Sequence, residues 1–285
     1  MWHIIGSTGF IGKNLLRRLP YETDYLCYAR NPISGEIPID IAQPGSFFKS
    51  MSTINAGDFV VLLAAVSSPD ICRDHYEEAY AVNVAGTKAF IEECLRRDAR
   101  VLFFSSDVVV GGTDHAHDET MPVHPAGNYG TMKYEVERAF AGDPRFKVFR
   151  LSYVFSKEDK FMRYLQTCAE NGETADVFQA LYRNVVYLND VLDAVIALGG
   201  SFGNWENSVF HLSGPELLCR ADMTECFKRF VAPALRYTTS IPKPHFFEAR
   251  PNCIETKSLY FSRLIGHEPL SLSYAVQLEF LEKKE

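Results

Sequence analysis

The chain has 285 residues, of which 47% are hydrophobic and 23% are charged, a composition that suits one large globular domain or two closely joined ones. The formal net charge of −7 argues against nucleic acid and anionic membranes as partners, because an acidic protein attracts neither. The longest apolar run, residues 59–66, is too short to span a bilayer. Seven isolated cysteines without a Cys-x2-Cys pair favour reduced thiols and a cytoplasmic protein.

Strand and helix signals alternate along residues 1–155. Short runs rich in Val, Leu and Phe predict strands, and longer polar-apolar runs predict helices between them. The predicted strands are residues 2–5, 24–29, 58–65, 100–106 and 146–155. The predicted helices are residues 10–19, 74–97 and 128–141. This alternation is typical of an α/β protein with a Rossmann-type, doubly wound parallel sheet that carries helices on both faces.

Beyond residue 155 the alternation is less regular. The sequence there predicts helices at 161–172 and 189–198, strands at 184–188 and 208–213, and a Pro-rich connection at 240–251. We predict that residues 1–155 form the Rossmann domain and that residues 185–213 return to it. We expect segments 156–184 and 214–285 to form a smaller C-terminal α/β lobe that binds the substrate.

Three glycines lie between the first predicted strand and the helix after it. Gly6, Gly9 and Gly12 follow a Gly-x2-Gly-x2-Gly spacing, which lets backbone N–H groups approach a diphosphate at the start of a helix. The hydroxyls of Ser7 and Thr8 can donate further hydrogen bonds. The sequence therefore predicts a dinucleotide-binding turn.

Arg30 directly follows the second predicted strand, at the position where an acidic residue would usually bind the adenosine ribose. An arginine at this place can pair with a 2′-phosphate, so NADP(H) is favoured and NAD(H) is the alternative. A solvated surface arginine would give the same sequence. Asp40 and Ile41 are candidates for the adenine edge, although an aspartate that merely ends a strand is nearly as plausible.

Tyr-x3-Lys occurs at Tyr129 and Lys133, at the start of a predicted helix. The spacing places both side chains on one helix face. A nearby ammonium is expected to lower the pKa of the phenol, so that the tyrosine exchanges a proton near neutral pH. The preceding strand ends in Ser105, Ser106 and Asp107, at the edge where open α/β sheets bind ligands.

The motifs GSTGFIG, YAVNVAGT, FFSSDVVVGG, NYGTMK, FRLSYVF and YLNDVLDAV occur in the order found in extended short-chain dehydrogenases/reductases. The chain resembles this family over nearly its whole length. SSDVVVGG, VFHLSGPE and RPNCIETKSL are most similar to its dTDP-4-dehydrorhamnose reductase branch. In that branch a Ser-Thr-Asp-Tyr motif is typical, whereas this chain has Ser106 for the threonine and Val108 for the tyrosine.

The resemblance implies that Tyr129 is the acid/base, that Lys133 modulates its pKa and anchors the ribose, and that Ser106 bonds the reacting carbonyl. It also implies that Asn83 helps to order the site near the nicotinamide. Arg250 is a candidate diphosphate clamp, because a guanidinium matches phosphate geometry, and a surface arginine is about equally plausible. The expected cofactor-binding residues are Gly6, Ser7, Thr8, Gly9, Phe10, Ile11, Gly12, Arg30, Asp40, Ile41, Leu63, Ala64, Ala65, Asn83, Tyr129 and Lys133. The expected substrate-binding residues are Ser67, Asp107, Val108, Tyr153 and Arg250.

These expectations describe an NADPH-dependent reductase of a nucleotide-diphospho-4-keto-6-deoxy sugar. Dimers are frequent in this family, so a homodimer is a candidate assembly, and the oligomeric state stays open. Two alternatives stay open: a nucleotide-sugar 4-epimerase with tightly bound NAD, and a regulatory subunit that binds NADP without turnover. The expected reduction requires no metal. The histidine-containing run at 115–119 is accordingly expected to be a solvated polar loop.

Overall fold

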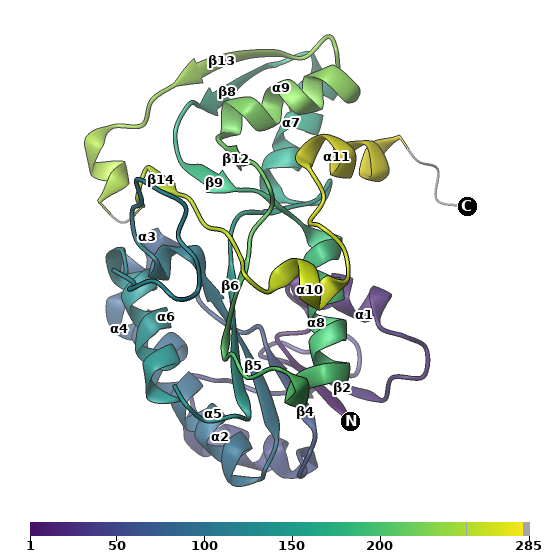
Figure 1. Cartoon of the computed structure of the whole chain (residues 1–285), viewed down its shortest axis with the longest axis vertical. Helices are drawn as coiled ribbons and strands as arrows, with labels where there is room; N and C mark the ends of the chain where they lie inside the picture. The colour runs from purple at the N-terminus through teal and green to yellow at the C-terminus, as the bar shows by residue number, and fades with distance from the viewer. Residues whose placement is uncertain (249, 282–285) are drawn as a thin grey trace.

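The computed structural model describes residues 1–248 and 250–281. At its centre is a parallel sheet of seven strands in the order β11-β6-β5-β4-β1-β2-β3 (Figure 1). The strands are β1 (Trp2–Ile5), β2 (Tyr25–Ala29), β3 (Ile37–Pro38), β4 (Phe59–Leu62), β5 (Arg100–Ser106), β6 (Phe146–Leu151) and β11 (Val209–Leu212). The chain winds outward in one direction through β2 and β3 and in the other through β4, β5 and β6, so the order reverses beside β1. The predicted doubly wound sheet is confirmed.

Both faces of the sheet are buried, because alternate residues of a strand point to opposite faces. In β4, Phe59 and Val61 belong to one hydrophobic core, whereas Val60 and Leu62 belong to the other. The first core includes α1 (Phe10–Arg18), α8 (Leu188–Ser201) and α10 (Phe261–Ile265). The second includes α2 (Pro44–Ser50), α5 (Thr87–Arg96) and α6 (Gly127–Ala139).

The segment predicted as one helix at 74–97 is divided in the structure. It contains the end of α3 (Pro69–Asp74), then α4 (Tyr76–Tyr80), a π-helical segment η2 (Ala81–Gly86) and α5. A Cβ on Gly86 would lie 1.7 Å from the carbonyl oxygen of Ile41, so this part of the chain packs directly on the backbone after β3. That close packing requires glycine and accompanies the local change of helical pitch.

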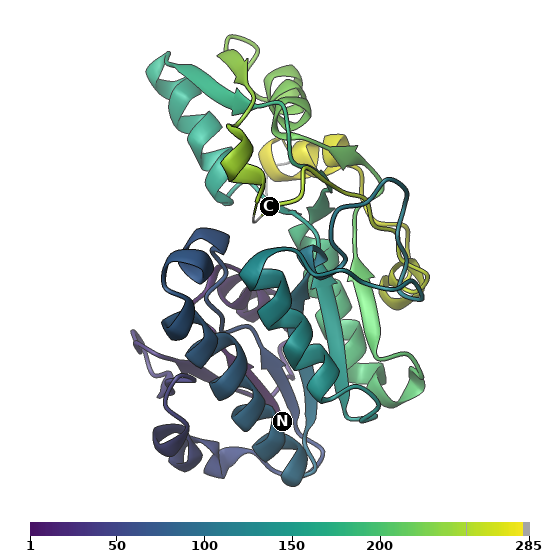
Figure 2. The ribbon, with the colours of Figure 1, turned by 90° about the vertical axis from the view of Figure 1, so that its left-hand side faces the viewer.

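A second lobe lies beyond the carboxyl ends of the sheet strands (Figure 2). Its helices and strands are β7 (Val154–Phe155), α7 (Lys160–Asn171), β8 (Thr174–Phe178), β9 (Tyr182–Asn184), β10 (Val186–Tyr187), β12 (Leu217–Leu218), α9 (Arg220–Phe230), β13 (Arg236–Ser240), η5 (Pro244–Phe247), β14 (Cys253–Ile254) and α11 (Leu272–Phe280). They enclose a separate core that contains Phe155, Leu165 and Phe227.

The sequence-based division into two domains stays a prediction, with one departure. Residues 261–265 were assigned to the smaller lobe, yet α10 packs on α8, and Phe261 and Leu264 are buried in the core of the sheet. The remaining short helical turns are η1 (Met51–Thr53), η3 (Asp107–Val109) and η4 (Phe202–Asn204).

Candidate active site

The turn between β1 and α1 is closely packed and leaves the helix start exposed. Gly6 has a φ of +90° and lies so close to β4 that a Cβ would be 3.0 Å from the backbone nitrogen of Ala64. A Cβ on Gly12 would be 2.6 Å from the carbonyl oxygen of Gly6. The N-cap residue, Gly9, has no side chain with which to cap α1. The N–H groups and partial positive charge at the start of α1 therefore fit a diphosphate.

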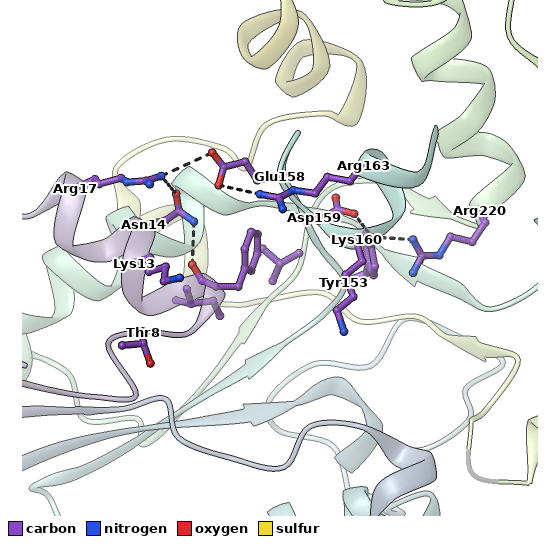
Figure 3. A pocket seen from close by; sticks show the side chains of 13 residues that line it. Thr8, Lys13, Asn14, Arg17, Tyr153, Glu158, Asp159, Lys160, Arg163 and Arg220 are labelled. Atoms are coloured by element: carbon purple, nitrogen blue, oxygen red, sulfur yellow. Dashed lines mark hydrogen bonds and ion pairs between the residues drawn. The ribbon is translucent and has the colours of Figure 1, made fainter. Parts of the chain in front are cut away.

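A cavity of about 520 Å³ adjoins this turn (Figure 3). One wall is Thr8 and the first two turns of α1, and the other belongs to the second lobe. Its charged lining residues are Lys13, Arg17, Glu158, Asp159, Lys160, Arg163 and Arg220. The five cations outnumber the two acids, and Glu158 is already shared by Arg17 at 3.7 Å and Arg163 at 3.8 Å. The cavity is therefore suited to an anionic ligand despite the negative charge of the whole chain.

The expected role of the Ser7 hydroxyl requires correction. Ser7 is only 2% exposed, and its hydroxyl donates inward to the carbonyl oxygen of Tyr28 at 3.2 Å. The hydroxyl therefore ties the turn to β2 and does not point toward a diphosphate. Thr8, Phe10 and Ile11, by contrast, line the large cavity.

The residues predicted to bind adenosine follow the carboxyl ends of neighbouring strands. Arg30 directly follows β2, is exposed, and has no hydrogen bond or ion pair within residues 1–248 and 250–281. The carboxylate of Asp40 accepts from the backbone nitrogen of Ala42 at 3.0 Å, so it caps its own turn. Ile41 is buried. Leu63, Ala64 and Ala65 are half-buried after β4.

Tyr129 and Lys133 lie one turn apart on α6, next to the end of β5. The ammonium of Lys133 lies 5.8 Å from the centre of the Tyr129 ring and donates to the carbonyl oxygen of Phe104 at 2.8 Å. Gly130 lets α6 approach this edge, because a Cβ there would be 3.0 Å from the carbonyl oxygen of Val108. Within the described part of the chain, the Tyr129 hydroxyl has no hydrogen-bond partner. A reacting oxygen could therefore occupy that position.

The electrostatics of this pair differ from the sequence-based expectation. Burial raises the pKa of the Tyr129 phenol above its ordinary value, and Cys72 and Asp107 shift it in the same direction. Burial also lowers the pKa of Lys133 to about 8. The prediction that the ammonium would lower the pKa of the phenol is therefore wrong for this structure, because desolvation of the phenol dominates. A protonated Tyr129 at neutral pH can act as an acid.

Ser106 ends β5 and is half-buried at the same edge. Its hydroxyl donates to Asp107 Oδ1 at 3.1 Å and accepts from the backbone nitrogen of Val108 at 3.4 Å. Asp107 Oδ2 accepts from Ser152 at 3.2 Å and lies 3.5 Å from the guanidinium of Arg183. Asp107 is thus a buried carboxylate behind Ser106, and Val108 contributes its backbone to the same turn.

Asn83 supports this edge from η2. Its side-chain amide exchanges two hydrogen bonds with the backbone of Val66, at 2.8 and 2.9 Å. Because Asn83 is 1% exposed, it acts as a fixed support for the loop after β4. That loop continues to Ser67, which is exposed.

Tyr153 lies where the chain crosses into the second lobe. Its hydroxyl donates to Asp159 at 2.8 Å and accepts from Arg220 at 2.8 Å (Figure 3). The Arg220 guanidinium also lies 4.2 Å from the centre of the Tyr153 ring and 4.3 Å from that of Phe161. Two aromatic rings and a hydrogen bond therefore hold Arg220 in one position.

Arg250 is already paired with an acid, contrary to the expectation of a free diphosphate clamp. It forms two hydrogen bonds with Asp70 of α3, at 2.9 and 2.5 Å. A second cavity of about 420 Å³ lies beside it, lined by Lys160, Phe161, Tyr164, Asp176, Phe178, Leu181, Arg220, Phe246 and Arg250. Arg220 lines this cavity and the large one, so it is the better placed of the two arginines for a ligand that spans both.

Sequence reasoning missed Arg220 and Arg183. The sequence does contain a local indication that Arg183 is buried, because this charged residue lies within the mostly apolar run LYRNVVYL. A buried arginine must have a partner for its charge. The importance of Arg220 depends on cavities between distant segments, which no local pattern indicates.

The run at 115–119 is not uniformly solvated, as the sequence suggested. His117 and Asp118 are 6% and 8% exposed, and His117 Nε2 contacts the carbonyl oxygen of Pro122 at 2.7 Å. Among residues 1–248 and 250–281, no cluster of three or more His, Cys, Asp or Glu side chains is placed to hold a metal ion. In the same residues, no helix combines the length and apolar character needed to cross a membrane.

Comparisons with known proteins agree with this architecture. The family model of the RmlD substrate binding domain matches residues 2–252. The dTDP-4-dehydrorhamnose reductase of Aggregatibacter actinomycetemcomitans is 24% identical over 217 residues, which cover 74% of this chain and 72% of that protein. The reductase of Mycolicibacterium smegmatis is 28% identical over 174 residues, covering 58% of this chain and 52% of that protein.

Solved structures share the fold at low identity. The dTDP-4-dehydrorhamnose reductase of Bacillus anthracis in complex with NADP superimposes with a TM-score of 0.83 at 19% identity, covering 99% of both chains. MoeE5 in complex with UDP-glucuronic acid and NAD superimposes with a TM-score of 0.80 at 19% identity, covering 98% of this chain and 97% of that chain.

Proposed function

Because this chain belongs to the RmlD substrate-binding-domain family, we propose that it is an NADPH-dependent reductase of a nucleoside-diphosphate 4-keto-6-deoxy sugar. The family membership confirms the resemblance inferred from the sequence. The observation that carries the proposal is the arrangement of Ser106, Tyr129 and Lys133 at the carboxyl edge of the sheet. The glycine turn, whose helix start fits a diphosphate, opens at the same edge.

When bound, NADPH supplies the hydride that reduces the sugar ketone. Tyr129 donates a proton to the ketone oxygen, and its raised pKa keeps that proton in place at neutral pH. Ser106 hydrogen-bonds the same oxygen and stabilises the charge that develops on it. Lys133 would hold the nicotinamide ribose through its ammonium, and Asn83 fixes the loop after β4.

Arg30 supports the preference for NADP(H), since it follows β2 and is exposed. We expect Arg30→Asp to lower NADPH affinity by about tenfold or more, because a carboxylate repels the 2′-phosphate and accepts hydrogen bonds from an unphosphorylated ribose. NADH affinity should improve at the same time. Fluorescence titration with both nucleotides measures the change, and Arg17→Asp tests whether any lost cation near the turn has the same effect. An unaltered ratio of NADPH affinity to NADH affinity in Arg30→Asp would show that Arg30 only faces water.

Lys133 gives cofactor binding a pH dependence. Its pKa is about 8, so the ammonium is present below that pH and is lost as the pH rises through it. We expect NADPH affinity to fall across this interval, and Lys133→Met to bind NADPH weakly throughout and without the inflection. Titrations at constant ionic strength measure both. An inflection that persists in Lys133→Met would assign the titration to another group.

The two cavities support a nucleoside diphosphate as the part of the substrate that is recognised. Aromatic side chains of the second cavity, such as Phe178 and Phe246, offer surfaces for a base. Arg220 borders both cavities and is held rigidly. A guanidinium matches the geometry of phosphate oxygens, so we infer that Arg220 binds the substrate diphosphate.

We expect Arg220→Met to weaken the binding of dTDP and UDP by roughly 30-fold, within the range for losing a charge-assisted contact to phosphate. Arg250→Met should weaken it by about threefold or less, because Asp70 already pairs with Arg250. Calorimetric titration of each nucleotide compares the two variants, with NADPH affinity as the control. Equal losses in both variants would contradict the assignment.

The function is tested by following NADPH oxidation with a panel of nucleotide 4-keto-6-deoxy sugars. We expect stoichiometric oxidation with at least one of them. Sugar interconversion without added cofactor would identify an epimerase, and NADPH binding without turnover would identify a regulatory subunit.

The proposal includes a cytoplasmic location, which the seven free cysteines support. A homodimer stays a prediction.

A further inference from the structure

The hydroxyl of Ser106 faces two demands, because a serine has a single O–H proton. In the structure that proton is donated to Asp107 Oδ1 at 3.1 Å. The proposed reduction requires the same proton at the ketone oxygen. Ser106 must therefore turn away from Asp107 during the reaction, and a buried carboxylate that loses a donor is costly unless another group replaces it.

Arg183 is the group placed to do so. It belongs to β9 in the second lobe, and its Nε lies 3.5 Å from Asp107 Oδ2. Two other guanidinium nitrogens donate to the carbonyl oxygens of Tyr182 at 2.7 Å and Pro251 at 2.8 Å. The side chains of Arg183 and Asp107 are 12% and 8% exposed. A cation anchored by its own lobe is thus aimed at the carboxylate behind Ser106.

We propose that Arg183 is a positioning residue of the reduction, which holds the carboxylate of Asp107 so that Ser106 can turn its hydroxyl toward the substrate ketone. The inference rests on the proposed function and extends it, because it links a residue of the second lobe to the carbonyl-binding hydroxyl. Ser152 also holds the Asp107 carboxylate, to which it donates at 3.2 Å, but its hydroxyl carries no charge.

The charges that face Asp107 set the expected pH dependence. Burial raises the pKa of the Asp107 carboxyl, and Arg183 opposes that rise. Tyr129 of α6 also faces it and stays protonated. Without Arg183 the pKa of the Asp107 carboxyl would rise further, and a neutral Asp107 would hold the Ser106 proton less strongly than the carboxylate does.

The test compares Arg183→Met, the double variant Arg183→Met/Asp107→Asn, and Arg236→Met as a control on the exposed strand β13. We measure kcat and KM from about pH 6 to about pH 8.5 together with NADPH affinity and thermal stability. Arg183→Met should lose roughly tenfold or more in kcat at the alkaline end of this range. That loss is smaller than the one expected for removing an oxyanion donor outright. KM and NADPH affinity should stay within about threefold of the natural values.

The same loss should shrink as the pH falls, whereas the double variant, which has no carboxylate at position 107 to titrate, should show a kcat loss that does not change with pH. Arg236→Met should match the natural protein. A purely structural role would lower thermal stability in parallel with kcat at every pH, and a substrate contact would raise KM; either result overturns the proposal, as does an unchanged kcat in Arg183→Met. Absence of turnover in the natural protein would instead refute the proposed function, and the inference with it.

Discussion

Tyr129→Phe is expected to lower kcat by about 10³-fold, because the reduction loses the acid that protonates the ketone oxygen. The phenyl ring keeps the packing of α6 against β5, so NADPH affinity should stay within about threefold. Stopped-flow fluorescence measures binding separately from turnover. The raised pKa of the phenol also fixes the direction of the pH dependence. The natural protein should keep the Tyr129 proton across neutral pH and lose activity only in alkali.

Tyr134→Phe provides a matched control on the same helix. Its ring contacts Arg138 near the surface, 5.9 Å from ring centre to guanidinium carbon. The control should keep near-natural kcat. A Tyr129→Phe variant with similar kcat would show that the proton comes from elsewhere.

Arg150→Met is expected to destabilise the fold by about 3–5 kcal/mol, because it leaves a buried carboxylate without its cation. Arg150 binds both oxygens of Glu137, including one contact of 2.6 Å, and the two side chains are 7% and 5% exposed. Glu137 also accepts from Ser105 at 2.5 Å. This pair fastens the helix that carries Tyr129 and Lys133 to β5 and β6.

Urea unfolding measures the effect, with Arg145→Met as the control. Arg145 pairs with Asp98 at 2.7 Å, but its side chain is 36% exposed, so its loss should cost about 1 kcal/mol or less. The double variant Arg150→Met/Glu137→Leu should recover most of the stability, since it removes the unpaired charge. Equal losses for Arg150→Met and Arg145→Met would show that burial does not strengthen the inner pair.

Local patterns were sufficient to predict the glycine turn and the Tyr129–Lys133 helix. Gly6 and Gly12 mark a turn whose close packing excludes a Cβ, and i,i+4 spacing fixes which side chains share a helix face. The parallel sheet followed from strands that alternate with helices. Strand β3 spans only Ile37–Pro38, too short for a periodic signal, and it was missed.

Long-range contacts account for what the sequence did not reveal. Arg250 was expected to be free, but its partner, Asp70, lies 180 positions earlier in the chain. The predicted helix at 74–97 breaks at His75, whose φ and ψ are −126° and 55°. Ser7 turned inward because β2 supplies a carbonyl acceptor. The pKa of Tyr129 depends on burial, which residue spacing does not report.

Hydride transfer is tested directly by reduction with NADPH that carries deuterium at both C4 positions of the nicotinamide. Mass spectrometry and NMR of the product sugar locate the label. We expect one deuterium at sugar C4 for each NADPH oxidised, and loss of that transfer in Tyr129→Phe. A C4-epimerised sugar without deuterium and without NADPH oxidation would contradict it.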